Sequence, residues 1–502
     1  MTEITKPVSE MEENVAAPNT STANAWQQFV EHFEAQDEAW HAAQSEKLLR
    51  KVDVRLLPTL VVIYALNFLD RSNLAQARQG NLEKDLHMKG TDFNLATSIL
   101  FVGYFLMQLP SNMLITRVRP SLYLSGAMMI WGVVSTCNAA VHSFGGLVAV
   151  RFILGFVEAP FFPGAIFLMS SWYTRAELTR RVSWFYSGNA IANIFGGVIA
   201  ASVLGHLDGR LGIAGWRWLF IIEGVATIFF ALCAAYILPN YPATTSWLND
   251  EEKAYASWRL LADINEEDAR FEQSAWAGAK LALSDYRLYI FVAFQHISVL
   301  SQTFQYFFPA IVNTLGYGKI TTLWLTAPVW FATFLTTIIV TFTSARTKDR
   351  SIHIACLMLM AAVGNAIATA TTAVGPRFFA MFLMPMGAMS AYTIILPWIA
   401  NTFPRPLVKR SACIAICNMT GNLASIYGSY MYPASASPRY IPGGTANTII
   451  CVLVAAISLI LRFVLIRENK KLERAEQEDV DTGGVQAGAS PEKRIVGFRY
   501  VH

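Results

Sequence analysis

Charged residues are scarce in this chain. Asp, Glu, Lys and Arg make up 15% of its 502 residues, against about 25% in an average soluble domain. Hydrophobic residues make up 54%, and the mean hydropathy is positive. This composition excludes an ordinary soluble globular protein and is typical of a protein that crosses a membrane several times. The net charge of +4 is too small to indicate a nucleic-acid partner.

Cysteine is also rare, and its positions exclude a disulfide framework. All six cysteines fall inside apolar segments, where we expect them to pack as small apolar side chains. The sequence has no phosphate-binding loop of the form G-x-x-x-x-G-K-[ST], no metal-ligand motif and no nucleophile triad. We therefore expect no metal and no cofactor, and neither an enzyme nor an ATP-driven pump.

Long apolar runs fill most of the chain and predict transmembrane helices. A helix that crosses a hydrocarbon core needs about 20 apolar residues. The fold class expected is an all-α membrane protein with twelve transmembrane helices in two six-helix bundles. The twelve segments lie near residues 56–77, 93–115, 121–141, 147–172, 182–204, 217–238, 286–312, 322–345, 352–373, 377–400, 410–432 and 446–466.

A long polar interruption divides these segments into two sets of six. It contains Asn249 followed by three acidic residues, which indicates the start of a surface helix. An amphipathic helix is also expected at about 23–49. The expected divisions are an N-terminal tail 1–50, a bundle 51–238, a linker 239–285, a second bundle 286–466 and a C-terminal tail 467–502.

Basic residues indicate the orientation in the membrane. An even number of spans puts both tails on one side, and Lys and Arg concentrate in cytoplasmic loops. The first residues, MTEITKPVSEMEEN, are polar and acidic and predict no cleaved signal peptide. We expect both termini and the linker to be cytoplasmic. The basic residues on that side are Arg117, Arg119, Arg175, Arg180, Arg181, Arg346, Lys348, Arg350, Arg405, Lys409 and Arg410.

The segment from Val148 to Trp172 carries two charges inside an apolar run. An ionisable side chain in mid-span costs roughly 2.5–3.5 kcal/mol, so Arg151 and Glu158 are candidates for function. They are seven residues apart, so they share one helix face about 10 Å apart, with Gly155 between them. Pro160 and Pro163 follow and each removes a backbone donor, which a span tolerates only beside protein or a watery cavity.

Asp70 and Arg71 form a second unusual pair, in the first span. They either cap its outer end or, if the helix continues to about Ala77, lie inside the membrane. Adjacent residues point about 100° apart on a helix, so the two would face different neighbours. Arg71 and Arg151 favour an anionic substrate, because a guanidinium offers paired donors that fit a carboxylate.

Glu158 is the candidate for proton coupling, and Asp70 is the alternative proton site. A carboxyl group in a low-dielectric setting can exchange a proton near neutral pH. The competing interpretation is a static ion pair of Glu158 with Arg151 or Arg71, which only fixes the packing.

His296 and Asn189 are further candidates for substrate binding. His296 belongs to a polar stripe with three glutamines, and Asn189 stands four residues before Asn193. Hydrogen bonds between helices are the alternative explanation for both.

A faint internal repeat relates the fourth and tenth spans. Arg151 and Trp172 are 21 residues apart, as are Arg377 and Trp398. Equivalent spans in two halves are typical of transporters. At the position equivalent to Glu158 the second half has Met384, so only the first half carries the carboxylate.

Three segments resemble the major facilitator superfamily: NFLDRSNL, RFILGFVEAPFFPG and WRWLFIIEG. The linker SWLNDEEKAYASWRL and the terminal GFRY are similar to the anion:cation symporter family, specifically its fungal allantoate permease-like branch. The resemblance covers nearly the whole chain after about residue 45. One departure is the loop SNMLITRVRPSLY, which lacks the acidic residue that the superfamily normally has there.

This resemblance implies the major facilitator fold, alternating access and proton-coupled uptake of organic anions such as allantoate, nicotinate, pantothenate and biotin. It also implies that Asp70, Arg71, Arg151 and Glu158 serve substrate binding and proton coupling. The predicted function is secondary active symport of a small organic anion with protons by a monomer in a lipid bilayer, the plasma membrane. Export of a fungal metabolite and a non-transporting nutrient sensor on the same scaffold are the alternatives.

Overall fold

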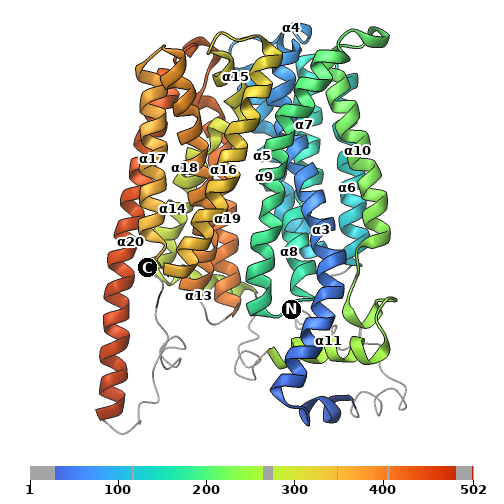
Figure 1. Ribbon diagram of the computed structural model, residues 1–502, viewed down its shortest axis with the longest axis vertical. Helices are drawn as coiled ribbons and strands as arrows, with labels where there is room; N and C mark the ends of the chain where they lie inside the picture. Colours follow the sequence, from blue (N-terminus) through green and yellow to red (C-terminus); the bar gives the residue numbers. More distant parts are fainter. Residues whose placement is uncertain are drawn as a thin grey trace.

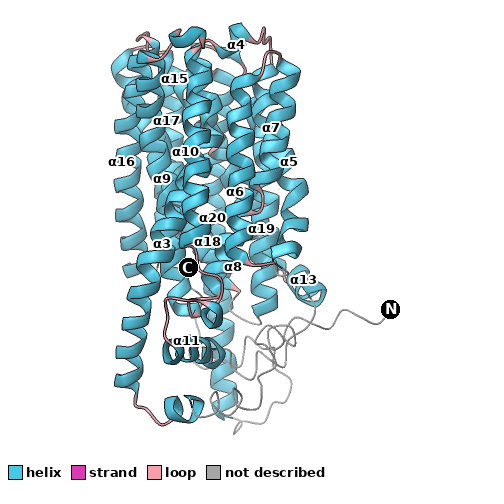
Figure 2. Ribbon diagram, turned by 90° about the vertical axis from the view of Figure 1, so that its right-hand side faces the viewer, coloured by secondary structure: helices cyan, strands magenta, loops and turns pink. Residues whose placement is uncertain are grey.

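The computed structural model describes residues 29–115, 118–263, 275–347, 349–403, 407–481 and 500. These residues form helices and connecting loops, and no strand occurs among them (Figure 2). The long helices run side by side (Figure 1). The start of α3 and the end of α20 lie at the same end of the molecule, where α11 crosses below the bundles. We name this the linker end and the opposite one the distal end.

Each of the twelve expected spans coincides with a helix or a broken helix. The first bundle contains α3 (Glu38–Ala77), α5 (Asp92–Ile115), α6 (Pro120–Cys137), α7 (Phe144–Glu158), α8 (Phe161–Ser170), α9 (Arg175–His206) and α10 (Gly215–Ile237). The second contains α14 (Tyr286–Ser301), α15 (Phe308–Asn313), α16 (Lys319–Thr347), α17 (Ser351–Ala370), α18 (Val374–Thr402), α19 (Leu407–Gly428) and α20 (Ile441–Asp481).

Two spans are broken. The fourth divides into α7 and α8 at Ala159 and Pro160, where the proline pair was expected to interrupt the helix. The seventh divides into α14 and α15, joined by the 3-10 turn Thr303–Phe307. Counting α7 with α8 as one, nine of the helices that the structure describes are long and apolar enough to cross a membrane. The other three spans, α5, α14 with α15, and α19, are held in the bundles by their contacts.

The two bundles repeat one pattern of helix contacts. In the first bundle α3 contacts α9 and α10, α5 contacts α7, and α6 contacts α7 and α10. In the second, α14 contacts α19 and α20, α16 contacts α18, and α17 contacts α18 and α20. Each contact joins spans of the same order in its half. The bundles meet through α5 with α19 and through α9 with α16. In both contacts the second span of one half meets the fifth span of the other.

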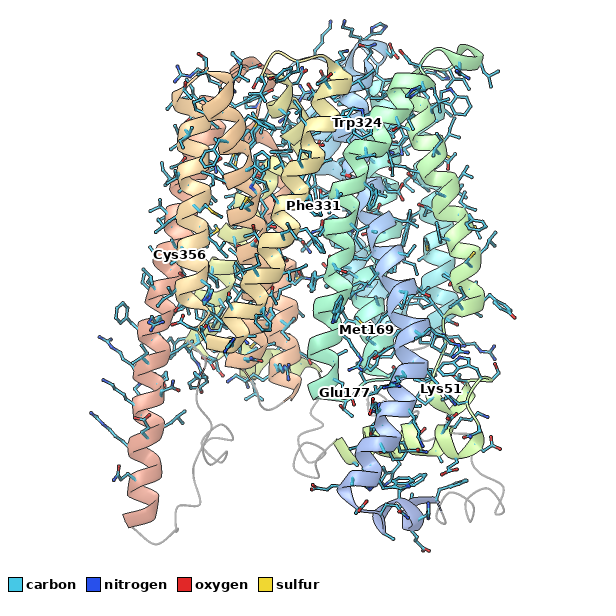
Figure 3. All side chains as sticks on the ribbon, in the orientation of Figure 1. Lys51, Met169, Glu177, Trp324, Phe331 and Cys356 are labelled. Carbon is cyan, nitrogen blue, oxygen red and sulfur yellow. The ribbon has the colours of Figure 1, made fainter. Side chains whose placement is uncertain are left out.

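The helices of the linker dock on different bundles. α11 (Asp250–Asp263) is tied to the first bundle by the ion pairs Lys51–Glu252, at 2.5 Å, and Arg259–Glu177, at 2.9 Å. Lys51 and Glu177 both lie near the linker end (Figure 3). α13 (Ala275–Leu283) packs against α19 and α14 of the second bundle. The two linker helices can therefore move with different halves of the molecule.

Large apolar side chains cover the outside of the bundles. Trp324 and Phe331 on α16, for example, are 48% and 51% exposed (Figure 3). An exposed apolar surface of this extent marks contact with another apolar phase. The surface matches the lipid-facing side of a multi-span membrane protein. Other members of it are Phe195, Phe229, Leu232, Ile339, Phe342, Val363, Ile449 and Phe463.

Candidate functional site

Asp70 and Arg71 lie inside the first span. α3 continues to Ala77, so the pair is nearly two turns from the helix end. Asp70 is fully buried, and the Arg71 side chain is 13% exposed. The interpretation of this pair as a cap at the membrane surface is therefore wrong.

Arg71 points towards α7 and forms an ion pair with Glu158. Its Nε lies 2.6 Å from Glu158 Oε2, and the Glu158 side chain is fully buried. The guanidinium also lies over the ring of Tyr104, 4.7 Å from its centroid. Of the two ion pairs considered from the sequence, the structure forms the one between spans one and four. Such a pair is costly to break by removing one partner, because the other charge stays buried.

Arg151 is the second buried arginine of the site, and it is less fully paired. It is 2% exposed, and its Nε donates a long hydrogen bond of 3.4 Å to the Ala96 carbonyl on α5. Its Nη1 has no hydrogen-bond partner among the described residues. The guanidinium therefore has donor capacity for a group that enters the site.

Gly155 determines how closely α7 approaches α5. A Cβ atom at this position would lie 1.9 Å from the carbonyl oxygen of Leu100, so only glycine permits the observed contact. The space beside Gly155 is thus filled by a helix. Close packing of these two helices holds Arg151 and Glu158 at fixed depth.

Asp70 faces away from Arg71, as the helix geometry predicts. Its carboxylate accepts hydrogen bonds from Ser135 Oγ at 2.6 Å, Trp131 Nε1 at 3.2 Å and Thr227 Oγ1 at 3.1 Å. These donors come from α6 and α10, behind α3. The two carboxylates expected to handle protons therefore lie on different faces of one helix, about 100° apart.

The second bundle contributes neutral polar and aromatic groups to the site. Tyr306 packs against Phe101 of α5, with ring centroids 5.4 Å apart, and it interacts electrostatically with both arginines. Gln295 is fully buried, and its Nε2 donates to the Tyr392 hydroxyl at 3.3 Å. The charged groups of the first bundle thus meet hydroxyl and amide groups of the second.

His296 and Asn189 occupy other positions. His296 lies between α14 and α19, where Nδ1 is 2.7 Å from the Thr420 carbonyl and Nε2 is 2.6 Å from the Tyr427 hydroxyl. Both ring nitrogens are thus already engaged. The Asn189 side-chain oxygen accepts from Asn193 Nδ2 at 2.6 Å, within α9. The structure does not join either residue to the two arginines by any contact that it describes.

The bundles touch at the distal end. Asn94 Nδ2 donates to the Ser429 carbonyl, and Lys319 Nζ donates to Asn81 Oδ1 at 2.6 Å. Below these contacts lies a small cavity between the bundles, and Gly197 there contacts Thr326. The cavity lining is Ser72, Ala75, Gln76, Asn193, Gly197, Gln305, Phe308, Pro309, Thr326 and Trp330. Asn193 is therefore the member of the asparagine pair that reaches a cavity.

Two aromatic residues of the site had no signal in the sequence. Tyr104 contacts the Arg71 guanidinium, and Tyr392 contacts Gln295. Tyrosine is common in membrane spans, so its presence alone does not indicate a site. Only the rotation of α5 and α18 in the bundles brings these side chains to the centre.

Comparison with known proteins finds a family model and curated relatives. Residues 60–429 match the model of the Major Facilitator Superfamily. The MFS-type transporter cnsO of Penicillium expansum is 34% identical over 454 residues, which is 88% of this chain and 87% of that protein. The Major facilitator-type transporter hxnP of Emericella nidulans is 30% identical over 458 residues, which is 88% of this chain and 90% of that protein.

Solved structures share the fold at low identity. A bacterial homologue of the human lysosomal transporter Spinster, in an inward-facing and unoccupied conformation, superposes with a TM-score of 0.64 at 14% identity. The alignment covers 81% of this chain and 96% of that one. A D-xylose-proton symporter gives a TM-score of 0.61 at 15% identity, covering 80% and 97% of the two chains. These structures confirm the all-helical, multi-span fold class expected from the sequence.

Proposed function

The chain belongs to the major facilitator superfamily and is a multi-pass membrane transporter rather than an enzyme, and on that premise we propose that it is a proton-coupled symporter of a small organic anion. We place it in the anion:cation symporter family, in the fungal allantoate permease-like branch. Its substrate is a carboxylate, a vitamin or a ureide-like acid. One observation carries the proposal: a buried Arg71–Glu158 ion pair beside Arg151, which keeps an unpaired donor.

The two arginines are suited to hold an anion. Both approach the centre from the first bundle, and Tyr306 of the second bundle interacts with both. A carboxylate can accept two parallel hydrogen bonds from one guanidinium, which fixes its orientation as well as its charge. Arg151 Nη1 is available now, whereas Arg71 Nε is occupied by Glu158. A substrate anion must therefore compete with Glu158 for Arg71.

This competition provides the coupling. While Glu158 is ionised, it holds Arg71; once it takes up a proton, it loses the charge that attracts the guanidinium. Arg71 is then released to the substrate anion, which replaces the lost negative charge. Binding of the anion favours the protonated carboxyl in turn, because linkage between two sites is reciprocal. Proton and substrate are thereby carried together.

We further propose that the linker end faces the cytoplasm and that the protein acts as a monomer in the plasma membrane. The start of α3, the end of α20 and the linker helix α11 all lie at that end (Figure 1). The ion pairs there use several basic residues, among them Arg181, Arg259 and Lys409. An excess of Lys and Arg in short loops marks the cytoplasmic side.

Export of a metabolite and nutrient sensing are the alternatives. An exporter could use the same pair of arginines on a different gradient. A sensor would bind the anion without carrying it, and would have no need for a carboxyl that competes for Arg71. The position of Glu158 within 2.6 Å of Arg71 therefore favours transport.

Reconstituted proteoliposomes test the proposal. A panel of labelled carboxylates, vitamins and ureides should include one that accumulates when the outside is acidic. Glu158→Gln keeps the side-chain shape but cannot titrate, so it should still exchange that substrate across the membrane while losing accumulation driven by the pH gradient. Accumulation by Glu158→Gln with wild-type pH dependence would show that Glu158 is structural. Binding without exchange in the wild type would support the sensor. Uptake driven only by an outward-directed proton gradient, with the inside acidic, would support the exporter.

A further inference from the structure

A second group of buried polar side chains lies behind α3, on a different face from the Arg71–Glu158 pair. Glu223 of α10 is 4% exposed, and neither of its carboxyl oxygens has a hydrogen-bond partner among the described residues. Asn73 of α3 is fully buried, and neither its Oδ1 nor its Nδ2 has a hydrogen-bond partner among the described residues. Buried polar atoms are nearly always paired, so these indicate a group that they bind.

The unpaired side chains lie at one depth, about one helical turn distal to Asp70. α3 and α6 run towards the distal end, and α10 runs back towards the linker end (Figure 1). The residue with unpaired atoms on each helix therefore lies three or four positions to the distal side of Asp70 or of a residue that donates a hydrogen bond to Asp70. The three pairs are Asn73 and Asp70 on α3, Asn138 at the C-cap of α6 and Ser135 on α6, and Glu223 and Thr227 on α10; of the Asn138 side chain only Oδ1 is unpaired, since Nδ2 donates to the Val134 and Ser135 carbonyls.

Few charged groups face this cluster. Glu223 interacts electrostatically with Asp70, and Asp70 interacts with Glu158 and Arg151 of α7. α6 presents two uncharged donors, Trp131 and Ser135, to Asp70. No ion pair that joins described residues involves Asp70 or Glu223. The cluster thus holds two carboxyl groups without a paired cation.

The hydrogen bonds assign different states to these carboxyls. Asp70 accepts three hydrogen bonds, which stabilise a negative charge. Glu223 accepts none from the described residues, so a second carboxylate there would be both desolvated and next to Asp70. As a neutral acid it needs only an acceptor for its proton, and the unpaired amide oxygens of Asn73 and Asn138 lie at its depth.

We propose that Glu223 and Asp70, with Asn73 and Asn138, form a second proton-binding site behind α3, separate from Glu158. With its proton the cluster carries one negative charge, and without it two. The second charge strengthens the hold of the cluster on the positive region at Arg71, the residue after Asp70, and opposes an incoming anion. Loading this site therefore favours substrate binding. This role in transport rests on the proposed function, whereas the existence of the site does not.

Infrared difference spectroscopy of the purified full-length protein, between acidic and alkaline buffer, tests the site without a substrate. A buried carboxylic acid has a C=O stretching band that is lost on ionisation. We expect the wild type to show bands from two sites. Glu158→Gln should remove one of them, and Glu223→Gln should remove the other. Exposed Glu251 is the control, and Glu251→Gln should leave both buried-acid bands unchanged.

The outcomes separate the two proposals. Unchanged bands in Glu223→Gln overturn the second proton site and leave Glu158 untouched. Unchanged bands in Glu158→Gln, with one band lost in Glu223→Gln, overturn coupling by Glu158 and support the second site. If Glu223→Gln does not fold, Asp70→Asn replaces it: removing the neighbouring charge must shift the Glu223 band, and an unshifted band overturns the pairing.

Thermal unfolding gives an independent measurement. A neutral Glu223 in the folded protein holds a proton that the unfolded chain releases above about pH 4, so this part of the stability is lost and the wild-type Tm should fall as the pH rises from there until Glu223 itself ionises. Glu223→Gln keeps a neutral group there, and its Tm should fall less over the same range. A fall in Tm identical to that of the wild type and of Glu251→Gln counts against the proposal.

Discussion

The N-terminal bundle and the C-terminal bundle pack their spans in the same pairs, yet they carry different side chains at their centres. The first bundle buries Asp70, Arg71, Arg151, Glu158 and Glu223 within its spans. In the second, the position equivalent to Glu158 is Met384, which is 2% exposed in an apolar core. Because the second bundle forms the same packing without these charges, the fold does not require them. The cost of burying them in the first bundle points to function.

The equivalent arginines show the same difference in detail. Arg377 of α18 donates to the Thr314 carbonyl at 3.3 Å and to Thr314 Oγ1 and the Pro438 carbonyl, both at 2.8 Å. It joins the end of α15 to the loop before α20. Among the described residues, Arg151 donates only its long hydrogen bond to the Ala96 carbonyl. Arg377 makes three hydrogen bonds to the protein, although its Nε also has no partner among the described residues, whereas Arg151 makes one long hydrogen bond and keeps more donor capacity for a ligand.

The largest expected effect follows from removing the arginines of the first bundle. Arg71→Ala and Arg151→Ala should each lower the rate of anion transport on the order of 100-fold or more, because two charge-assisted hydrogen bonds are lost. Lys at either position should restore only part of the rate, since an ammonium lacks the paired donors. Uptake of the identified substrate into vesicles, normalised to surface protein, measures this.

Arg71→Ala also leaves Glu158 buried without its partner, which by itself costs about 3–5 kcal/mol. The matched control is Arg71→Ala with Glu158→Gln, which should recover stability but not transport. If both Ala variants transport with unchanged affinity, the two arginines do not bind the anion, and the comparison of the bundles loses its functional meaning.

A steric change at Gly155 should have the next largest effect, on stability. Valine there would place carbon atoms against the Leu100 backbone and separate α5 from α7. Overpacking typically lowers the free energy of unfolding by about 1–3 kcal/mol. Because the atoms in the way belong to the backbone of α5, which cannot move aside like a side chain, we expect a loss of about 3 kcal/mol or more here. Gly126 of α6 is the control, since a Cβ there meets nothing within 4 Å. Equal Tm values for Gly155→Val and Gly126→Val would show that the helix contact is softer than the structure indicates.

The equivalent test in the second bundle is Arg377→Ala. We expect it to lower the free energy of unfolding by about 2–3 kcal/mol, because three hydrogen bonds of a charged donor are lost and buried acceptors are left unpaired. Substrate affinity of the folded fraction should not change. Denaturation in detergent and a binding titration measure the two quantities. A lowered affinity with unchanged stability would assign Arg377 to the site and remove the asymmetry between the bundles.

The sequence predicts the spans and the separation of Asp70 from Arg71, because hydropathy and helix rotation are local properties. It does not determine the partner of Glu158. The sequence offers both Arg71 and Arg151 as partners, and the choice depends on how α3 and α7 are rotated against each other. His296 illustrates a further limit: its ring is engaged by Tyr427, a residue 131 positions away. A polar residue in a span looks the same in the sequence whether a helix or a ligand satisfies it.

The smallest expected effect concerns Asp285, at the linker end of the second bundle. Burial by itself would raise the pKa of this carboxyl, but hydrogen bonds from Arg287 and Lys409 lower it from 3.8 to about 2. A lowered pKa in the folded protein means that this stabilisation is present above about pH 4 and is lost as the pH falls towards 2. Screening by solvent at this partly open position reduces the contribution to about 1–2 kcal/mol.

Asp285→Asn should therefore lower the Tm at pH 7 and have progressively less effect as the pH falls from 4 towards 2. Asp250 is the control, because its side chain is 89% exposed and its pair with Lys253 lies on the surface of α11. Surface pairs contribute little, so Asp250→Asn should leave the Tm nearly unchanged at every pH. A constant difference between Asp285→Asn and the wild type across this range would mean that the side chain stabilises by shape rather than by charge. Arg377 at the distal end and Asp285 at the linker end would then stabilise the second bundle in different ways, the first through its charge and the second through its shape.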